Sequence, residues 1–310
     1  MENKNIIITG GCGFIGSHIV DELIDKNKIT IVDNLSTGKI KNLKTPYHEN
    51  LNIIEEDIRE VNWDNLTLNK DYVFHLAAMA SVPLSVNEPI ECNDTNLNAT
   101  VKLLKSSVKN NVKKIIFSSS AAVYGQNTNM PLKETEPLMP TSPYAASKAS
   151  CEVYLKSFHE SYGLNYTALR YFNVFGPRQD KNSQYAAVIP NFISALLKGE
   201  QPVIYGDGKQ TRDFVYVGDI VKTNILAGKS DYNGVINVAS GEKLTINELF
   251  AIISNTLEID LEPKYLPERP GDIKHSLADI SRLNEINLKI DSNNFEVQIK
   301  KTIRWFEDNL

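Results

Sequence analysis

The sequence predicts a doubly wound, parallel α/β (Rossmann-type) sheet with a smaller α+β substrate-binding lobe. Short runs rich in β-branched residues alternate with helical patterns between residues 5 and 170, which is typical of βαβ units. A glycine-rich turn joins the first of these runs to the first helical pattern. Beyond residue 176 the segments become shorter, and proline and glycine become more frequent, which indicates a second unit of different construction.

The first strand is expected at residues 5–9, an apolar run typical of a strand buried on both faces. It leads directly into Gly10, Gly13 and Gly16, and a helix with an apolar stripe follows. The glycines permit a tight turn, close approach of the backbone to a pyrophosphate, and close packing of helix on strand. Free N–H groups at the helix start favour phosphate. This context predicts a dinucleotide site.

The next strand, residues 28–32, ends at Asp33, at the distance from the glycines that such sites show. A carboxylate there accepts hydrogen bonds from a ribose 2′-hydroxyl and repels a 2′-phosphate, so the sequence favours NAD over NADP. The alternative is that Asp33 only caps the loop that follows it.

Four further strands complete the predicted sheet, with an amphipathic helical segment at residues 96–109 covering it. The strands are expected at residues 51–55, 72–76, 114–117 and 166–170. The strand at 72–76 runs into Ala77, Ala78 and Ala80, whose small side chains leave room for a flat ligand against the backbone.

A set of hydroxyl and amine side chains points to chemistry at the same edge of the sheet. The serines at 118–120 follow an apolar run, so they are expected at the carboxyl end of a strand, where ligands bind in open α/β sheets. Tyr144 and Lys148 are four residues apart and would share one helix face. We expect the ammonium to lower the pKa of Tyr144 from about 10 so that it acts as a general base. The alternative is a surface Tyr and Lys on an ordinary helix.

The boundary between the two units is expected near residue 175. Residues 1–175 would form the NAD-binding domain, and residues 176–310 a substrate-binding lobe over the carboxyl edge of the sheet. A segment near 212–239 is expected to return to the main sheet, with residues 234–238 as its strand.

Composition argues against several classes of partner. A net charge of −5 provides no basic stripe for nucleic acid and no polybasic membrane patch. The three cysteines form no CxxC pair, the histidines show no metal-ligand spacing, and no apolar run approaches the length of a membrane span. We therefore expect a cytoplasmic, soluble protein with free thiols, no signal peptide and no metal.

Eight segments together carry a resemblance that covers essentially the whole chain. They are TGGCGFIGSH (9–18), VDN (32–34), HLAA (75–78), SSSAAVYG (118–125), SPYAASK (142–148), RYFNVFGPRQ (170–179), GDGKQTRDFVYVGD (206–219) and RPGD (269–272). On these motifs the chain resembles the extended short-chain dehydrogenase/reductase family and, within it, the nucleotide-sugar 4-epimerases. A homodimer is implied in the same way, with the helices near 96–109 and 145–161 as contacts.

The resemblance implies three catalytic residues and a set of cofactor contacts. Tyr144 would take the proton from the sugar O4, Lys148 would lower its pKa and hold the nicotinamide ribose, and Ser120 would hydrogen-bond O4. NAD would accept the C4 hydride and return it to the opposite face of a bound 4-ketose. Cofactor contacts are expected from Gly10, Gly13, Phe14, Ile15, Gly16, Asp33, Asn34, Ser36, Gly38, Asp57, Ile58, Leu76, Ala77, Ala78, Ala80, Asn96, Ser118, Tyr144, Lys148 and Tyr171.

The later lobe supplies the expected nucleotide-sugar contacts. Lysines outnumber arginines 26 to 7, so an arginine in this chain suggests bidentate recognition of an anion. By the resemblance, Arg212 and Arg269 grip a diphosphate, while Arg178 is as readily a structural salt bridge. The full expected set is Ser81, Ser120, Tyr144, Asn173, Ala187, Val188, Tyr205, Arg212, Arg269, Asp272 and Ser276.

Small side chains bear on which reaction and which sugar are expected. Ala121 and Ala122 stand where related dehydratases carry acidic residues, and alanine cannot do acid–base work. Ser276 and Ala187 stand where enzymes of plain hexoses typically carry Tyr and Asn, which would open room for an acetamido group at C2. Interconversion of UDP-N-acetylglucosamine and UDP-N-acetylgalactosamine is therefore expected. Alternatives are a UDP-glucose 4-epimerase, an NAD(P)H-dependent 4-keto-sugar reductase, and a non-catalytic NAD-binding protein.

Overall fold

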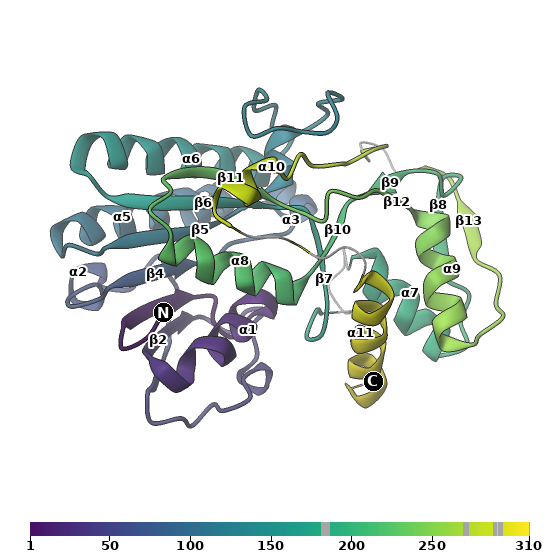
Figure 1. Ribbon diagram of the computed structural model, residues 1–310, viewed down its shortest axis with the longest axis horizontal. Helices are drawn as coiled ribbons and strands as arrows, with labels where there is room; N and C mark the ends of the chain where they lie inside the picture. The colour runs from purple at the N-terminus through teal and green to yellow at the C-terminus, as the bar shows by residue number, and fades with distance from the viewer. Residues whose placement is uncertain (181–186, 269–272, 288–289, 291–293, 310) are drawn as a thin grey trace.

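The computed structural model describes residues 1–180, 187–268, 273–287, 290 and 294–309. A parallel seven-stranded sheet with the strand order β11-β6-β5-β4-β1-β2-β3 forms the larger lobe, as the sequence predicts (Figure 1). Its strands are β1 (Asn5–Thr9), β2 (Lys28–Asp33), β3 (Leu51–Glu55), β4 (Tyr72–His75), β5 (Lys114–Ser120), β6 (Asn165–Tyr171) and β11 (Gly234–Val238).

Helices cover both faces of this sheet, which explains the unbroken apolar runs of its central strands. Ile6, Ile7 and Ile8 of β1 are fully buried although their side chains alternate between the two faces. One face packs on α1 (Phe14–Leu23) and α8 (Val217–Lys229). The other packs on α2 (Trp63–Leu66), α5 (Ala99–Lys109) and α6 (Pro143–Tyr162).

Local sequence signals fix the helix that carries the expected catalytic pair. Ser142 caps α6, because its side chain accepts a hydrogen bond from the Ala145 N–H, and Pro143 occupies the first helical position. Gly163 ends the helix in the left-handed conformation. Tyr144 and Lys148 therefore lie in the first two turns, on one face.

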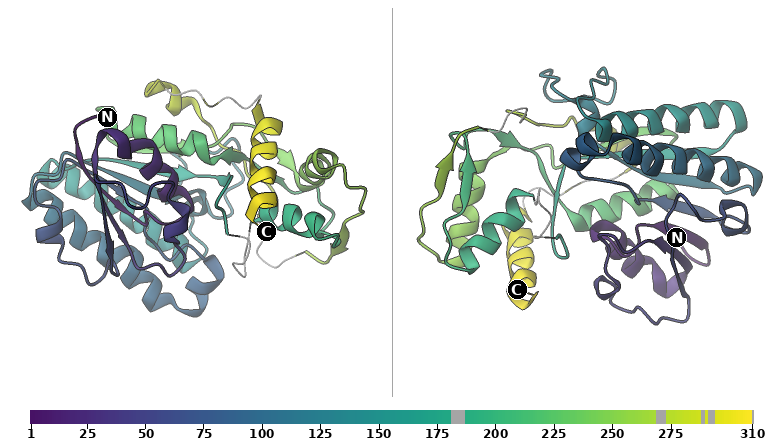
Figure 2. Two further views of the ribbon diagram at one scale, coloured as in Figure 1. Left: turned by 90° about the horizontal axis from the view of Figure 1, so that it is seen from below. Right: turned by 180° about the vertical axis from the view of Figure 1, so that it is seen from behind.

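The smaller lobe begins where the main sheet ends. Strand β7 (Asn173–Phe175) starts two residues after β6 and pairs with β10 (Phe214–Tyr216). Its helices pack around one apolar core, and Figure 2 shows them gathered at one end of the molecule. They are α7 (Val188–Leu197), α9 (Ile246–Leu257) and α11 (Phe295–Asn309). Its short strands form the pairs β8 (Val203–Tyr205) with β13 (Lys264–Leu266) and β9 (Thr211–Arg212) with β12 (Leu244–Thr245).

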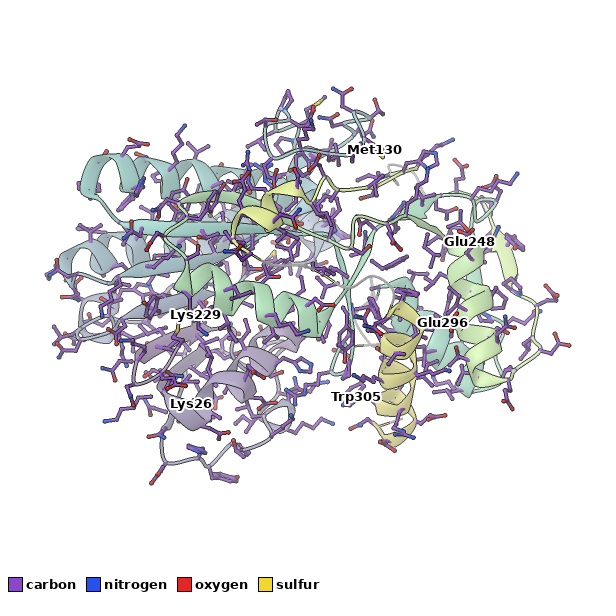
Figure 3. The ribbon with its side chains drawn as sticks, viewed as in Figure 1. Lys26, Met130, Lys229, Glu248, Glu296 and Trp305 are labelled. Carbon is purple, nitrogen blue, oxygen red and sulfur yellow. The ribbon has the colours of Figure 1, made fainter. Side chains whose placement is uncertain are left out.

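A side-chain cap stabilises the start of one helix of this lobe. Thr245 and Glu248 form a reciprocal capping box at the start of α9, with Glu248 labelled in Figure 3. Trp305 lies on α11 of the same lobe, whereas Lys26 and Lys229 lie on the larger one (Figure 3).

Short segments complete the chain between these elements. They are η1 (Ile24–Lys26), η2 (Ile40–Asn42), α3 (Val82–Asn87), α4 (Pro89–Asn93), η3 (Asp94–Asn98), η4 (Ala121–Tyr124) and α10 (Ser281–Glu285). No helix within the described ranges is both long and apolar enough to cross a membrane.

Two predicted boundaries are wrong. Strand β5 continues through Ser120 instead of stopping at residue 117, because Ser118, Ser119 and Ser120 keep pairing with β6. The helix expected at residues 96–109 begins as α helix only at Ala99, since the turn before it is a π-helix.

Candidate active site

The glycine turn after β1 packs directly against the segment that follows β4, at the point where the strand order of the sheet reverses. A Cβ on Gly10 would lie 2.9 Å from the Ala77 nitrogen, and one on Gly16 would lie 2.1 Å from the Gly10 carbonyl oxygen. The Thr9 hydroxyl accepts hydrogen bonds from the N–H groups of Leu76 and Ala77. Backbone therefore lines this edge closely, as a flat dinucleotide requires.

The carboxylate of Asp33 lies at the end of β2, beside the glycine turn. It is buried and accepts hydrogen bonds from the Cys12 N–H (2.9 Å) and the Leu35 N–H (2.9 Å). A Cβ on Gly38 would lie 2.8 Å from this carboxylate, so the loop approaches it as glycine alone allows. The donors and the space fit NAD, whose ribose would reach an anchored carboxylate here.

Neighbouring polar residues extend this corner of the site. Asn34 donates to Asp57 (2.9 Å) and accepts from the Ser36 N–H (3.1 Å). The Arg59 guanidinium beside Asp57 holds the pKa of that carboxyl at about 2, so it is ionised at neutral pH. Sequence reasoning did not include Arg59, although its position two residues after Asp57 is a signal for such a pair.

Three of the expected cofactor residues are engaged within the fold. The buried Asn96 amide bonds to both backbone groups of Met79 and to the Ser147 hydroxyl. The Tyr171 hydroxyl donates to Asn224 (3.0 Å), and Ile58 is buried in the apolar core beneath α5 and α6. The Asn96 bonds join the segment after β4 to the catalytic helix, which is a positioning role.

The expected catalytic side chains converge at the carboxyl edge of β5. The Ser120 hydroxyl lies beside the phenol of Tyr144, whose pKa it lowers, and it accepts from the Ala122 N–H (3.1 Å). Lys148 is buried, donates to the Ser118 carbonyl (2.7 Å), and lies 4.8 Å from the centre of the Phe117 ring. Ser119 points elsewhere and donates to Glu152 (2.5 Å).

The expectation that Lys148 lowers the pKa of Tyr144 is wrong for the chain alone. Burial raises the pKa of Tyr144, and the neighbouring Ser120 hydroxyl opposes that shift. Burial also lowers the pKa of Lys148 to about 8. The ammonium is directed at the Ser118 carbonyl rather than at the phenol, so its influence on the tyrosine is small.

Three expected substrate residues are tied together in the smaller lobe. Asn173 bonds to the Asp213 carbonyl through its backbone (3.1 Å) and side-chain (2.9 Å) N–H groups. Arg212 directly precedes Asp213 and donates to the Thr211 carbonyl. The Ser276 N–H donates to that same carbonyl (3.1 Å). These contacts bring Asn173, Arg212 and Ser276 onto one small framework.

Tyr205 borders a cavity of about 240 Å³ at the outer end of this lobe. Gly206, Gln210 and His275 also line it, and the Gln210 amide donates to the Tyr205 carbonyl (2.8 Å). Backbone and amide groups beside an aromatic ring suit a planar base.

The other expected residues lie apart from this framework. Ala187 is exposed and precedes α7, which begins at Val188. Ser81 caps α3 by accepting from the Leu84 N–H (3.2 Å). Arg178 forms a buried salt bridge with Asp21 (2.6 Å), so the structural alternative holds for it. Arg269 and Asp272 fall outside the described residues.

Two buried residues that hold the site were not singled out from the sequence. Thr9 links the ends of β1 and β4, and Asp213 links four segments of the smaller lobe. No group of metal-ligating side chains occurs among the residues described.

Comparisons with known proteins agree with this geometry. Residues 6–239 match the NAD dependent epimerase/dehydratase family. A UDP-N-acetylglucosamine 4-epimerase from Methanobrevibacter ruminantium M1, solved in complex with UDP-N-acetylmuramic acid, is 64% identical, covers 100% of both chains and superposes with a TM-score of 0.99.

Two more distant relatives show the spread of activities on this scaffold. A UDP-glucose 4-epimerase from Thermotoga maritima, solved with UDP-glucose, is 41% identical, with a TM-score of 0.92 and coverage of 98% of this chain and 99% of that one. A UDP-N-acetyl-alpha-D-glucosaminuronate decarboxylase from Bacillus cytotoxicus is 37% identical over 98% of both chains.

Proposed function

Because the chain belongs to the NAD dependent epimerase/dehydratase family, we propose that it interconverts UDP-N-acetylglucosamine and UDP-N-acetylgalactosamine by inversion at C4. The observation that carries this proposal is the convergence of Ser120, Tyr144 and Lys148 at the carboxyl edge of β5, on the side of the sheet where the glycine turn meets Ala77. A sugar hydroxyl and a dinucleotide could both be held at this edge.

The side chains of this chain divide the work of the reaction. NAD, when bound, supplies the acceptor and donor of the C4 hydride. In its phenolate form Tyr144 would receive the proton of the sugar O4 and become a phenol, and Ser120 would hydrogen-bond the same oxygen. Lys148, with its pKa near 8, carries positive charge at neutral pH and would hold the nicotinamide ribose of NAD. The proton returns from Tyr144 to O4 after the sugar has turned its other face.

The neighbourhood of Ser120 favours epimerisation over dehydration. Ala121 and Ala122 follow it in η4 and carry no acid or base. A dehydratase needs such a group to remove the C5 proton and to protonate the departing hydroxyl. Inversion at C4 needs neither.

The preference for an N-acetylated sugar rests on Ser276. This residue is small and lies on the framework with Arg212 and Asn173. A tyrosine at this position would occupy the space that we assign to the acetamido group. We expect Ser276→Tyr to lower kcat/KM for UDP-N-acetylglucosamine by at least tenfold and to leave UDP-glucose turnover within a few fold. Equal losses on both substrates would contradict this assignment.

A product assay tests the main proposal. Purified protein without added cofactor is incubated with UDP-N-acetylglucosamine or UDP-glucose in D₂O, and the C4 configuration is read by proton NMR. We expect inversion with retention of the C4 hydrogen, because the hydride returns from the same bound cofactor. In parallel assays, net consumption of added NADPH would instead indicate a reductase, and loss of CO₂ from an added UDP-hexuronate would indicate a decarboxylase.

We also propose that the enzyme works as a cytoplasmic homodimer. Exposed apolar side chains gather on helices that pack on one another, namely Ile90 of α4 with Val153 and Tyr154 of α6. All three cysteines are free and buried, which suits a reducing compartment. Light scattering tests the proposed dimer, and cell fractionation tests the proposed cytoplasmic location.

A further inference from the structure

Asp213 is a fully buried carboxylate at the centre of the smaller lobe's framework. It lies between β9 and β10 and is 0% exposed. No ion pair links it to any residue that the structure describes. A buried charge of this kind is costly unless hydrogen bonds satisfy it.

Four donors from two separate segments satisfy this carboxylate. One oxygen accepts from the Ser240 N–H (2.8 Å) and hydroxyl (2.7 Å). The other accepts from the N–H groups of Gly241 (3.1 Å) and Ala278 (3.2 Å). The turn at 240–241 follows β11 of the main sheet, and Ala278 follows Ser276 by two residues.

The backbone of the same residue holds a third segment. Its carbonyl accepts both N–H groups of Asn173, at the start of β7. Arg212 is its neighbour in the chain, and Thr211 binds the segment around Ser276 through the His275 ring (3.0 Å) and the Ser276 N–H (3.1 Å). The bonds of the Asp213 carbonyl and of Thr211 therefore end on the expected substrate contacts Asn173 and Ser276 and on His275, the neighbour of Ser276.

We propose that Asp213 is the positioning residue of the nucleotide-sugar site, which its carboxylate assembles by fixing the 240–241 turn and the 276–278 segment against Arg212 and Asn173. This inference rests on the proposed function. Asp213 itself contacts no reacting atom in this scheme. Its loss releases four charge-assisted hydrogen bonds and loosens the 240–241 turn and Ala278 against the segment that carries Arg212.

The test uses Asp213→Asn in the full-length enzyme. The substitution replaces one carboxylate oxygen, which accepts two hydrogen bonds, with an amide NH₂ group of nearly the same volume. That NH₂ group is a donor and faces two other donors, so both hydrogen bonds are replaced by repulsion. We expect KM for UDP-N-acetylglucosamine to rise at least tenfold and kcat to change less than threefold. UDP binding by calorimetry should weaken by a similar factor, and the NAD content should stay at the wild-type level because the glycine turn lies elsewhere.

Two companion variants make the outcome decisive. Ser240→Ala removes one donor and keeps the backbone, so we expect a smaller rise in KM that disappears in the Asp213→Asn background. Asp260→Asn changes an exposed carboxylate of the same lobe and should leave KM unchanged. If Asp213→Asn does not fold, the Ser240→Ala result decides.

The possible outcomes separate this inference from the proposed function. A lowered Tm with unchanged KM and unchanged UDP affinity in the Asp213→Asn or Ser240→Ala variant would overturn the inference alone. A wild-type protein that binds no UDP would overturn both. A raised KM with additive effects in the double variant would show that Ser240 does not act through Asp213, and would also contradict the inference.

Discussion

The hydroxyl of Tyr144 is the proton acceptor that the proposed reaction cannot replace. It lies beside the Ser120 hydroxyl, and the ring contributes packing that phenylalanine would retain. We expect Tyr144→Phe to lower kcat by roughly 10²- to 10⁴-fold with little change in Tm. Turnover and thermal melting of purified protein check this.

A matched control lies on the same helix. Tyr162 is 62% exposed at the end of α6. Tyr162→Phe removes the same group as Tyr144→Phe, at the opposite end of the helix. Its turnover should equal that of the wild type. Similar losses in both variants, or none in Tyr144→Phe, would remove Tyr144 from the mechanism.

Lys148 should make stability depend on pH in a defined window. Burial lowers its pKa from 10.5 to about 8, so between these values the unfolded chain binds a proton that the folded chain does not. Stability therefore rises with pH across that window, and below pH 8 the buried charge costs on the order of 3 kcal/mol. Lys148→Met removes this cost but also the bond to the Ser118 carbonyl, worth about 1–3 kcal/mol.

The pH dependence of Tm distinguishes the two contributions. At pH 7 they offset each other, and Lys148→Met should be as stable as the wild type or slightly more stable. At pH 10 only the lost hydrogen bond remains, so the variant should be the less stable protein. A stability difference that stays constant from pH 7 to pH 10 would show that Lys148 has an ordinary pKa.

At this scale the sequence identified residue types better than their partners. Tyr144 and Lys148 share a helix face as predicted, because four-residue spacing fixes that in any helix. Spacing does not fix where a flexible lysine directs its ammonium, so the bond to the Ser118 carbonyl and the raised pKa of Tyr144 required the tertiary structure. Asp213 was not predicted, because the groups that donate to its carboxylate belong to residues 240–278, and no local sequence pattern indicates such distant contacts.

At the scale of elements, the turn between β1 and α1 depends on the missing side chain of Gly16. A methyl group there would lie 2.1 Å from the Gly10 carbonyl oxygen, a backbone atom that can move only with the whole turn. We expect Gly16→Ala to lower the NAD released on denaturation by at least tenfold and to lower Tm through lost ligand binding. Enzymatic cycling of the released NAD gives the first quantity.

Gly163 provides the comparison. It has φ of +73° at the end of α6, and nothing lies within 4 Å of where its Cβ would be. Gly163→Ala should cost about 1–2 kcal/mol of backbone strain and leave the NAD content unchanged. Equal NAD contents in the two variants would mean that the turn tolerates the methyl group and does not cradle the cofactor.

Strands were easier to predict than the element boundaries that depend on pairing with a neighbouring strand. The β-branched run at residues 5–9 matches β1, which is buried on both faces, and residues 51–55 match the edge strand β3. The serines of β5 carry no strand signal and are strand only because β6 pairs with them. Helix α8 was not singled out, although it covers the main sheet from within the later part of the chain.

For the whole molecule, the chain order explains how two lobes share one site. After β6 the chain leaves the main sheet and enters the smaller lobe through β7. It later returns through β10 and α8 to β11, the edge strand that pairs with β6. Asn173 in β7 and Arg212 in β9 therefore lie close along the chain to the two points where it crosses between the lobes. A division of the chain near residue 175 stays a proposal, since residues after it belong to both lobes.

The last prediction concerns association of two whole molecules. Val153 is 62% exposed on α6, which packs on α4 and its exposed Ile90. An interface centred on these side chains would bury Val153 away from water, and a lysine ammonium there would have to be desolvated. We expect Val153→Lys to raise the dimer dissociation constant at least tenfold, seen by light scattering across a dilution series. Val297→Lys makes the same change at a 49% exposed site on α11 of the smaller lobe and should leave the dimer intact. If Val153→Lys remains dimeric at every concentration at which the wild type is dimeric, the α4–α6 face is not the interface.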